Sequence, residues 1–210
     1  MHSGARPARH SVCAVRALES TSAGRSTRAL EAMIQPRCLI WLCLMVSASA
    51  WAAPMTFPGA TTTLASPTGG AELIWIEPIG DTPHQLVLRF TDGQVRLVIP
   101  FERHCTVAWD PSGRMFAVSD VFASNESRVT IFSLTKSETL VPVPLHLPSR
   151  LELLLKDGDH SYVEVSDWTS TGLRLVAWGY GGKLEKEFRR KVVCTLTSES
   201  AATCAESHGL

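Results

Sequence analysis

Residues that could carry out chemistry are few in this sequence, and none of them stands in a complete motif. Asp157, Asp159 and His160 could donate oxygen and nitrogen atoms to a metal ion. Asp167 would be a distant fourth ligand. Their spacing is not that of an EF-hand loop, and an Asp-Gly pair is typical of a hairpin turn that needs no metal. Residues 179–183 end in Gly-Gly-Lys but lack the first glycine and the hydroxyl residue of a phosphate-binding loop. The sequence therefore predicts no metal-binding, cofactor-binding or catalytic residues.

Aromatic and basic residues near the C-terminus indicate binding instead. Trp178 and Tyr180 stand beside glycines, which makes them the best candidates for exposed aromatic side chains. The one basic cluster follows at Arg189, Arg190 and Lys191. It could meet an acidic partner, although such charges also protect a sheet edge from pairing. These five residues form the predicted partner-contact site.

The N-terminal part of the chain predicts export. Residues 33–37 carry one positive charge and precede an apolar run at 38–46, which is too short for a membrane span of about 20 residues. Ala-Trp-Ala at positions 50–52 resembles a signal-peptidase cleavage site. We therefore predict a signal peptide at residues 33–53, a mature chain that begins at Ala53 or Pro54, and no membrane span after cleavage.

Residues 1–32 are rich in Ser, Ala and Arg and poor in large apolar residues, so they cannot bury enough surface to fold. They are a long n-region, a transit peptide, or an untranslated extension before a start at Met33. We favour the start at Met33, because a complete signal peptide begins there. Without residues 1–52 the chain has 14 basic and 18 acidic residues, a net charge of −4. This charge gives no electrostatic reason to expect nucleic acid as a partner.

Three cysteines remain after cleavage, and an exported protein meets an oxidising environment. Cys194 and Cys204 flank a polar segment that can turn back on itself, so we predict a disulfide between them. Cys105 lies in an apolar hairpin and is better explained as a small buried hydrophobic residue. A bridge between Cys105 and Cys194 stays open as an alternative if their strands are neighbours.

The mature chain predicts a single all-β domain over residues 71–210, after an extended arm at 54–70. About ten short runs of β-type residues are separated by turns, and no apolar run of helical period has capping signals. Residues 151–155 are read as one of these strands. Val-Pro-Val-Pro at 141–144 predicts an edge strand or an extended crossing, because proline cannot donate to a sheet.

The clearest hairpin surrounds an Asp-Gly pair at positions 92–93, which favours a two-residue type I′ turn. That turn predicts three apolar cross-strand pairs: Phe90 with Val95, Leu88 with Leu97, and Leu86 with Ile99. A shift of one residue would place Arg96 on the core face.

A second hairpin, at residues 104–120, is apolar on both faces of both strands. Its turn, Asp-Pro-Ser-Gly at 110–113, suits a type I geometry. Because a sheet covered on one face alternates apolar and polar residues, this hairpin should lie between two other layers. We expect it at the centre of the core.

Two segments look like copies of one unit. Trp-Asp-Pro-Ser-Gly at 109–113 precedes Met-Phe-Ala-Val at 115–118, and Trp-Thr-Ser-Thr-Gly at 168–172 precedes Leu-Arg-Leu-Val at 173–176. The unit resembles the repeat of β-propellers of the TolB and prolyl-oligopeptidase kind. This resemblance implies blade-like antiparallel sheets packed face to face, as in a partial propeller or a sandwich. A closed propeller needs at least about four blades of four strands, so a complete one is not expected.

Propeller-type domains without an attached catalytic domain usually present loops to a partner. Together with the predicted signal peptide, the resemblance implies an exported, non-enzymatic module, periplasmic or extracellular, that binds another secreted protein or an envelope component. The loops at residues 121–127 and 179–183 would make the contact. A small secreted hydrolase without a recognisable motif, or a structural envelope protein, stays open as an alternative.

Overall fold

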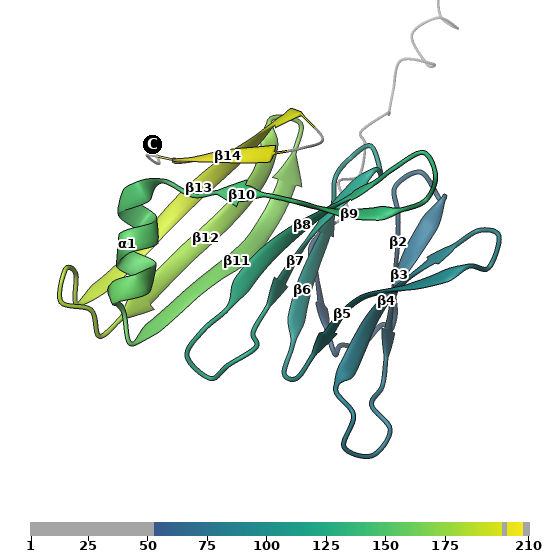
Figure 1. Cartoon of the computed structure of the whole chain (residues 1–210), viewed down its shortest axis with the longest axis horizontal. Coiled ribbons are helices and arrows are strands. Elements are labelled where there is room, and N and C mark those ends of the chain that lie inside the picture. The colour runs from purple at the N-terminus through teal and green to yellow at the C-terminus, as the bar shows by residue number, and fades with distance from the viewer. Residues whose placement is uncertain (1–52, 199–200, 208–210) are drawn as a thin grey trace, which may run out of the picture. The chain divides into compact units, whose positions relative to one another are not determined.

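The hairpin at residues 104–120 lies in a sheet that is covered on both faces, as its sequence predicts. The computed structural model describes residues 53–198 and 201–207, which all belong to one compact unit of the chain. They form three β-sheets and one helix, so the predicted all-β class is confirmed (Figure 1). The predicted signal peptide lies outside the described residues except for Ala53. No helix within those residues is long and apolar enough to cross a membrane.

Each sheet contains four consecutive strands that pair as an antiparallel meander. The first sheet has the order β2-β3-β4-β5, with β2 (Thr63–Ala65), β3 (Ala71–Ile76), β4 (His84–Phe90) and β5 (Val95–Phe101). The middle sheet has the order β1-β6-β7-β8-β9, with β1 (Met55–Phe57), β6 (Cys105–Trp109), β7 (Met115–Asp120), β8 (Arg128–Leu134) and β9 (Leu140–Val143). The last sheet has the order β10-β14-β13-β12-β11, with β10 (Leu145–His146), β11 (His160–Thr169), β12 (Gly172–Tyr180), β13 (Glu187–Ser198) and β14 (Ala201–Glu206). Helix α1 (Ser149–Asp157) connects β10 to β11.

One face of the middle sheet packs against the first sheet. Val107, Trp109 and Phe116 point to this side, where they share a buried cluster with Leu73 and Leu86 of the first sheet. All five side chains are at most 2% exposed. The hydrophobic effect of this burial is the main force that holds the two sheets together.

The opposite face of the middle sheet packs against the last sheet and α1. Ala108 and Ala117 alternate with the residues of the first cluster, as strand geometry requires, and lie on this second side. They share a second buried cluster with Leu175 and Val192 of the last sheet and with Leu154 of α1. The prediction that the hairpin occupies the centre of the core is confirmed.

The two proposed copies of the repeat occupy matching places in their sheets. Trp109 ends β6 and Trp168 lies near the end of β11, and each of these strands begins a meander. Their side chains are 2% and 4% exposed. Trp109 packs in the cluster shared with the first sheet and Trp168 in the cluster shared with the middle sheet, so each faces the preceding layer. The relationship to β-propellers itself stays a hypothesis.

The β4–β5 hairpin has a three-residue loop instead of the predicted two-residue turn. The Phe90 amide donates to the Gln94 carbonyl at 2.9 Å, and Gly93 takes a left-handed φ of 88°. This arrangement is the loop with a glycine bulge that a three-residue hairpin favours. The predicted pair of Phe90 with Val95 is therefore wrong.

The longer loop shifts the next pairs by one residue. Leu88 lies opposite Arg96 instead of Leu97, and Leu97 is left 57% exposed. Because β5 is an edge strand, the Arg96 side chain can reach solvent, and an inward-pointing charge at an edge discourages further pairing. A bulge between Leu86 and Val87 shifts the register again, so that Leu86 lies opposite Ile99, as predicted.

Two further segments differ from their predictions. Residues 151–155 were expected to form a strand, and no helix was expected in the mature chain. Both predictions are wrong, because these residues belong to α1. Leu151 and Leu154 are three residues apart and both face the core, which is the spacing of a helix. Residues 54–70, expected to form an extended arm, contribute β1 and β2 to two different sheets.

Candidate functional site

Four of the five predicted contact residues share the outer face of the last sheet. On β12, Leu175 and Ala177 point to the core, so the alternate residues Trp178 and Tyr180 point outward. The β12–β13 register places Arg189 directly opposite Trp178, and Lys191 follows two residues later on the same face. Arg189 and Lys191 are exposed, and Tyr180 is 44% exposed. We call this set, with the aromatic residues that join it from β11, the outer face.

Two aromatic residues of β11, which the sequence analysis did not single out as contact residues, complete the outer face. The ring of His160 stacks on that of Tyr180 with centroids 4.2 Å apart, and Tyr162 stacks on Trp178 at 4.1 Å. Each pair is formed by directly opposite residues of β11 and β12. Stacked pairs of this kind are worth about 0.5–1.5 kcal/mol beyond their buried area. They hold Trp178 and Tyr180 in fixed positions.

Tyr162 connects the outer face to the loop at residues 121–127. Its hydroxyl donates to the Ser124 carbonyl at 2.7 Å, and only 9% of the residue is exposed. Burial and, next, the neighbouring Tyr180 raise the pKa of Tyr162, so the phenol stays a neutral donor. The loop is thereby fixed beside the aromatic pairs.

Both predicted contact loops meet at the turn that follows α1. The Asn125 amide nitrogen donates to the Asp159 carbonyl at 3.1 Å. From the other side, the Leu184 backbone amide donates to the Asp157 carboxylate at 2.7 Å. Gly181 has a φ of 85°, and a Cβ there would come within 2.6 Å of the Asp159 carboxylate, so this loop position requires glycine. The two loops thus form one edge of the outer face.

Arg190 differs from the other predicted contact residues, because it points to the opposite side of β13. It lies between Phe188 and Val192, which are both buried in the core, and its guanidinium contacts Glu185 at 2.6 Å and Glu206 at 3.7 Å. Hydrogen bonds from Arg150, at 3.0 Å, and from Arg190 lower the pKa of Glu185. Arg190 therefore joins β13 to its neighbouring segments and is not part of the outer face.

The cysteines follow the first of the two predicted arrangements. Cys194 and Cys204 form a disulfide across the β13–β14 pair. Cys105 lies in the other buried cluster, against the first sheet, so the alternative bridge to Cys194 is excluded. Burial and, next, the charge of Asp120 raise the pKa of the Cys105 thiol to about 12, so this thiol is not a nucleophile at neutral pH.

The side chains considered as metal ligands do not converge. The Asp157 carboxylate accepts the Leu184 amide, and the His160 ring is stacked on Tyr180. Within residues 53–198 and 201–207, no three His, Cys, Asp or Glu side chains are grouped so that they could hold a metal ion. The outer face is suited to contact with another molecule's surface, through its rings and cations.

Comparisons with models of protein families, with curated proteins and with solved structures give no match to this chain. The functional inference therefore depends on the geometry of the outer face and on the sequence.

Proposed function

We propose that this chain is an exported, non-enzymatic binding protein that contacts another protein or an envelope component through the outer face. The observation that carries this proposal is the grouping of Trp178, Tyr180, Arg189 and Lys191 on neighbouring strands. Tryptophan, tyrosine and arginine are the residues enriched in the energetic centres of protein interfaces. Because the rings are already stacked, little side-chain entropy would be lost on binding.

The two cations of the outer face favour acidic groups on the part of the partner that meets them, whereas Glu187, opposite Tyr180 on the same side of β13, is itself negative. Arg189 and Lys191 are exposed, and no ion pair within the described residues involves either side chain. Opposite charges on a partner would steer association and fix its orientation. The interaction should accordingly weaken as the salt concentration rises.

Export is supported by the N-terminal sequence and by the disulfide. Bridges such as Cys194–Cys204 form and persist in oxidising compartments and are rare in the cytosol. The intact mass of the protein recovered from the envelope or the medium tests this part, with a mature chain that begins near Ala53 as the expected result. A mass that retains residues 1–32 would contradict both the start at Met33 and the cleavage.

The binding role is tested by affinity capture from the native envelope, followed by titration of the captured component. Tyr180→Ala and Lys191→Glu should each weaken binding at least about 30-fold if they are central to the interface. Lys136→Glu is the matched control, since Lys136 is an exposed lysine in the β8–β9 turn and should leave binding unchanged. Equal binding by all three variants would refute the outer face as the contact surface. Hydrolytic activity abolished by His160→Ala would favour the enzyme instead.

A further inference from the structure

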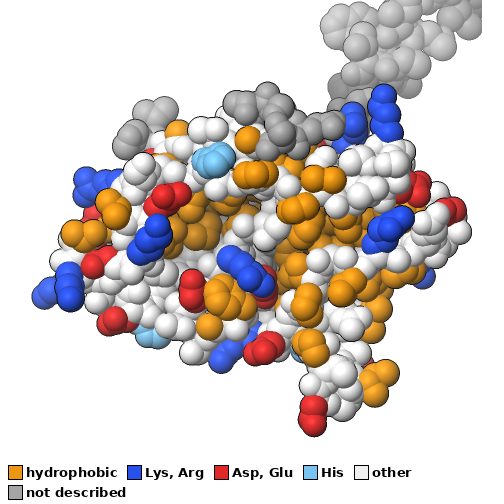
Figure 2. Space-filling view, viewed as in Figure 1, with side chains coloured by type: hydrophobic (Ala, Val, Ile, Leu, Met, Phe, Trp, Pro, Cys, Tyr) orange, Lys and Arg blue, Asp and Glu red, His pale blue; other side chains and the backbone are white. Residues whose placement is uncertain are grey.

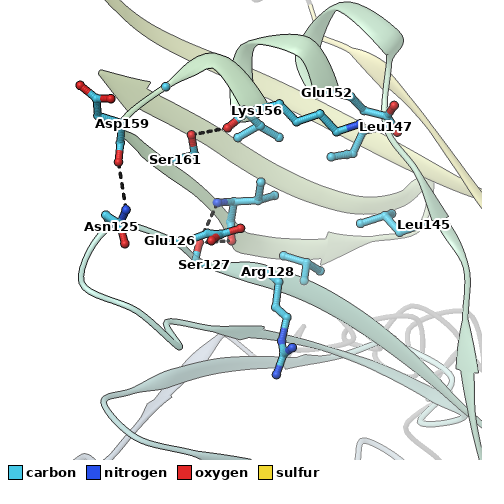
Figure 3. A pocket seen from close by; sticks show the side chains of 14 residues that line it. Asn125, Glu126, Ser127, Arg128, Leu145, Leu147, Glu152, Lys156, Asp159 and Ser161 are labelled. Atoms are coloured by element: carbon cyan, nitrogen blue, oxygen red, sulfur yellow. Dashed lines mark hydrogen bonds between the residues drawn. The ribbon is translucent and has the colours of Figure 1, made fainter. Parts of the chain in front are cut away.

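A cleft of about 500 Å³ lies between the start of β8, β11 and the segment that carries β10 and α1, and it shares residues 125–127 with the loop at the edge of the outer face (Figure 3). Its apolar lining comes from the middle sheet, the last sheet and the connection between them, and consists of Val129, Leu145, Leu147, Leu155 and Val163. In the view of Figure 2, hydrophobic side chains line a hollow beside α1 and β10. The volume falls in the range of ligand-binding clefts, about 300–1,000 Å³.

The cleft is flanked by strand edges that lack a partner strand. β8 pairs with β7 along its length, but it pairs with β9 only from Ile131 to Leu134. Residues 128–130 of β8 therefore have a partner strand on one side only, within the described part of the chain. On the far side of the cleft, β10 pairs with β14 alone.

The sequence explains why this gap exists. Val143 still pairs with Ile131 of β8, whereas the next residue, Pro144, separates β9 from β10. The chain there leaves the middle sheet and joins the last sheet, as the Val-Pro-Val-Pro sequence predicted for a crossing. An unpaired strand edge that is neither covered nor blocked can accept an extended chain as an added strand.

The walls of the cleft are held in place by hydrogen bonds. The Ser127 hydroxyl donates to the Val163 carbonyl at 3.0 Å and accepts the Val163 amide at 2.8 Å, which joins β8 to β11. The Ser161 amide donates to the Asn125 carbonyl at 2.9 Å. Because these bonds already exist, a ligand would not have to order the walls.

The rim of the cleft carries a surplus of negative charge. Glu126, Glu152 and Asp159 line it and are exposed, and none of them forms an ion pair with another described residue. Of the two basic residues of the rim, Arg128 pairs with Asp120 at 3.2 Å and points away from α1 (Figure 3). Lys156 is the other. Three carboxylates against one ammonium that has no ion pair among the described residues favour a cationic ligand.

We propose that this cleft binds an extended peptide segment of a partner protein in which a Lys or Arg stands between two apolar residues. The segment pairs with residues 128–130 of β8 as an added strand. Successive side chains of a strand point to opposite sides. An apolar residue of the segment that lies opposite Val129 shares its side and can enter the lining around Val129 and Val163, while the basic residue next to it points to the other side of the strand, toward the rim. This site shares residues 125–127 with the edge of the outer face but contains none of the aromatic or basic side chains of that face, and it does not depend on the function proposed for them.

The test is an NMR titration of the purified ¹⁵N-labelled protein with the peptide acetyl-Thr-Val-Lys-Val-Thr-amide. Shifts should be centred on the amides of residues 126–130. Replacement of Lys by Glu in the peptide should weaken binding on the order of tenfold or more. Methylation of both Val nitrogens should abolish binding, because it removes the donors of the added strand.

Variants of the protein test whether the rim carboxylates bind the basic residue of the peptide. Glu126→Gln combined with Glu152→Gln should weaken binding of the Lys peptide on the order of tenfold. Glu77→Gln, at an exposed acidic residue after β3, and Tyr180→Ala, on the outer face, should leave binding of the peptide unchanged. Equal binding of the Lys and Glu peptides, undiminished binding of the methylated peptide, or no shift at about 5 mM peptide would overturn the proposal. If the amide chemical shifts of residues 126–130 change with protein concentration in the absence of peptide, the site binds a second copy of the chain, and the proposal is overturned.

Discussion

Reduction of the Cys194–Cys204 bridge should destabilise the domain by an amount that its loop length sets. The two cysteines are ten residues apart in sequence and directly opposite on β13 and β14. A bridge that closes a loop of this length removes about 9 cal/mol/K of entropy from the unfolded chain in the loop-closure model. At 25 °C this corresponds to about 2.7 kcal/mol of the free energy of unfolding. Such a loss is a large share of the stability of an ordinary domain, about 5–15 kcal/mol.

Equilibrium unfolding in urea, followed by tryptophan fluorescence with and without reductant, measures this difference. The midpoint should fall on reduction. Cys194→Ala combined with Cys204→Ala should unfold near the reduced midpoint and should not respond to reductant. A shift in the free energy of unfolding below about 0.5 kcal/mol in the wild type would refute the loop-closure reasoning. A peptide map that joins Cys105 to Cys194 would contradict the fold itself, since these residues lie in different buried clusters.

Three further outcomes are expected. Trp109→Ala and Trp168→Ala should each lower the free energy of unfolding by about 3–5 kcal/mol in urea titrations, because both side chains are at most 4% exposed; a cost below about 1 kcal/mol for either would show that its site is not part of the core. Cys105 should not react with a thiol reagent until the protein unfolds, since it is fully buried and its pKa is raised to about 12; fast labelling of the native protein would contradict this. Burial raises the pKa of Asp120 in spite of its pair with Arg128, so the folded state binds that proton more tightly than the unfolded state. The stabilising contribution of the protonated carboxyl is full below the unfolded pKa and is lost as the pH rises through the folded pKa. The stability of the wild type relative to Asp120→Asn, measured by urea unfolding, should therefore fall as the pH rises above the ordinary aspartate pKa of 3.8, and a rise would contradict the sign.

Features that depend on residue type alone were predictable from the sequence. The two-sided apolar pattern of residues 104–120 predicted a strand pair between two layers, because a sheet covered on one face only alternates apolar and polar residues. The prolines at 142 and 144 predicted the edge strand and the crossing, since proline removes a donor wherever it stands. The pairing of Cys194 with Cys204 followed from the short polar segment between them.

The helix α1 was missed because five apolar-rich residues suit a strand as well as a helix. The distinguishing signal was present in the spacing of Leu151, Leu154 and Leu155, which fits one face of a helix and leaves Leu153 57% exposed. Helices as short as α1 depend on packing more than on propensity, and packing is a property of the whole fold.

The composition of the outer face could not be read from the sequence, because it depends on one bulge. The turn after β11 pairs Thr169 with Gly172, and an unbroken ladder from there would place Tyr162 opposite Gly179, with no ring to stack on. The irregularity between Val165 and Asp167 shifts the register by one residue and brings Tyr162 opposite Trp178. Bulges follow from the local competition between ladder hydrogen bonds and packing of both faces, and their position has no short sequence signature. The same shift keeps Val163 and Val165 in the core while the rings stay outside. The bulge therefore determines which rings stack on the outer face.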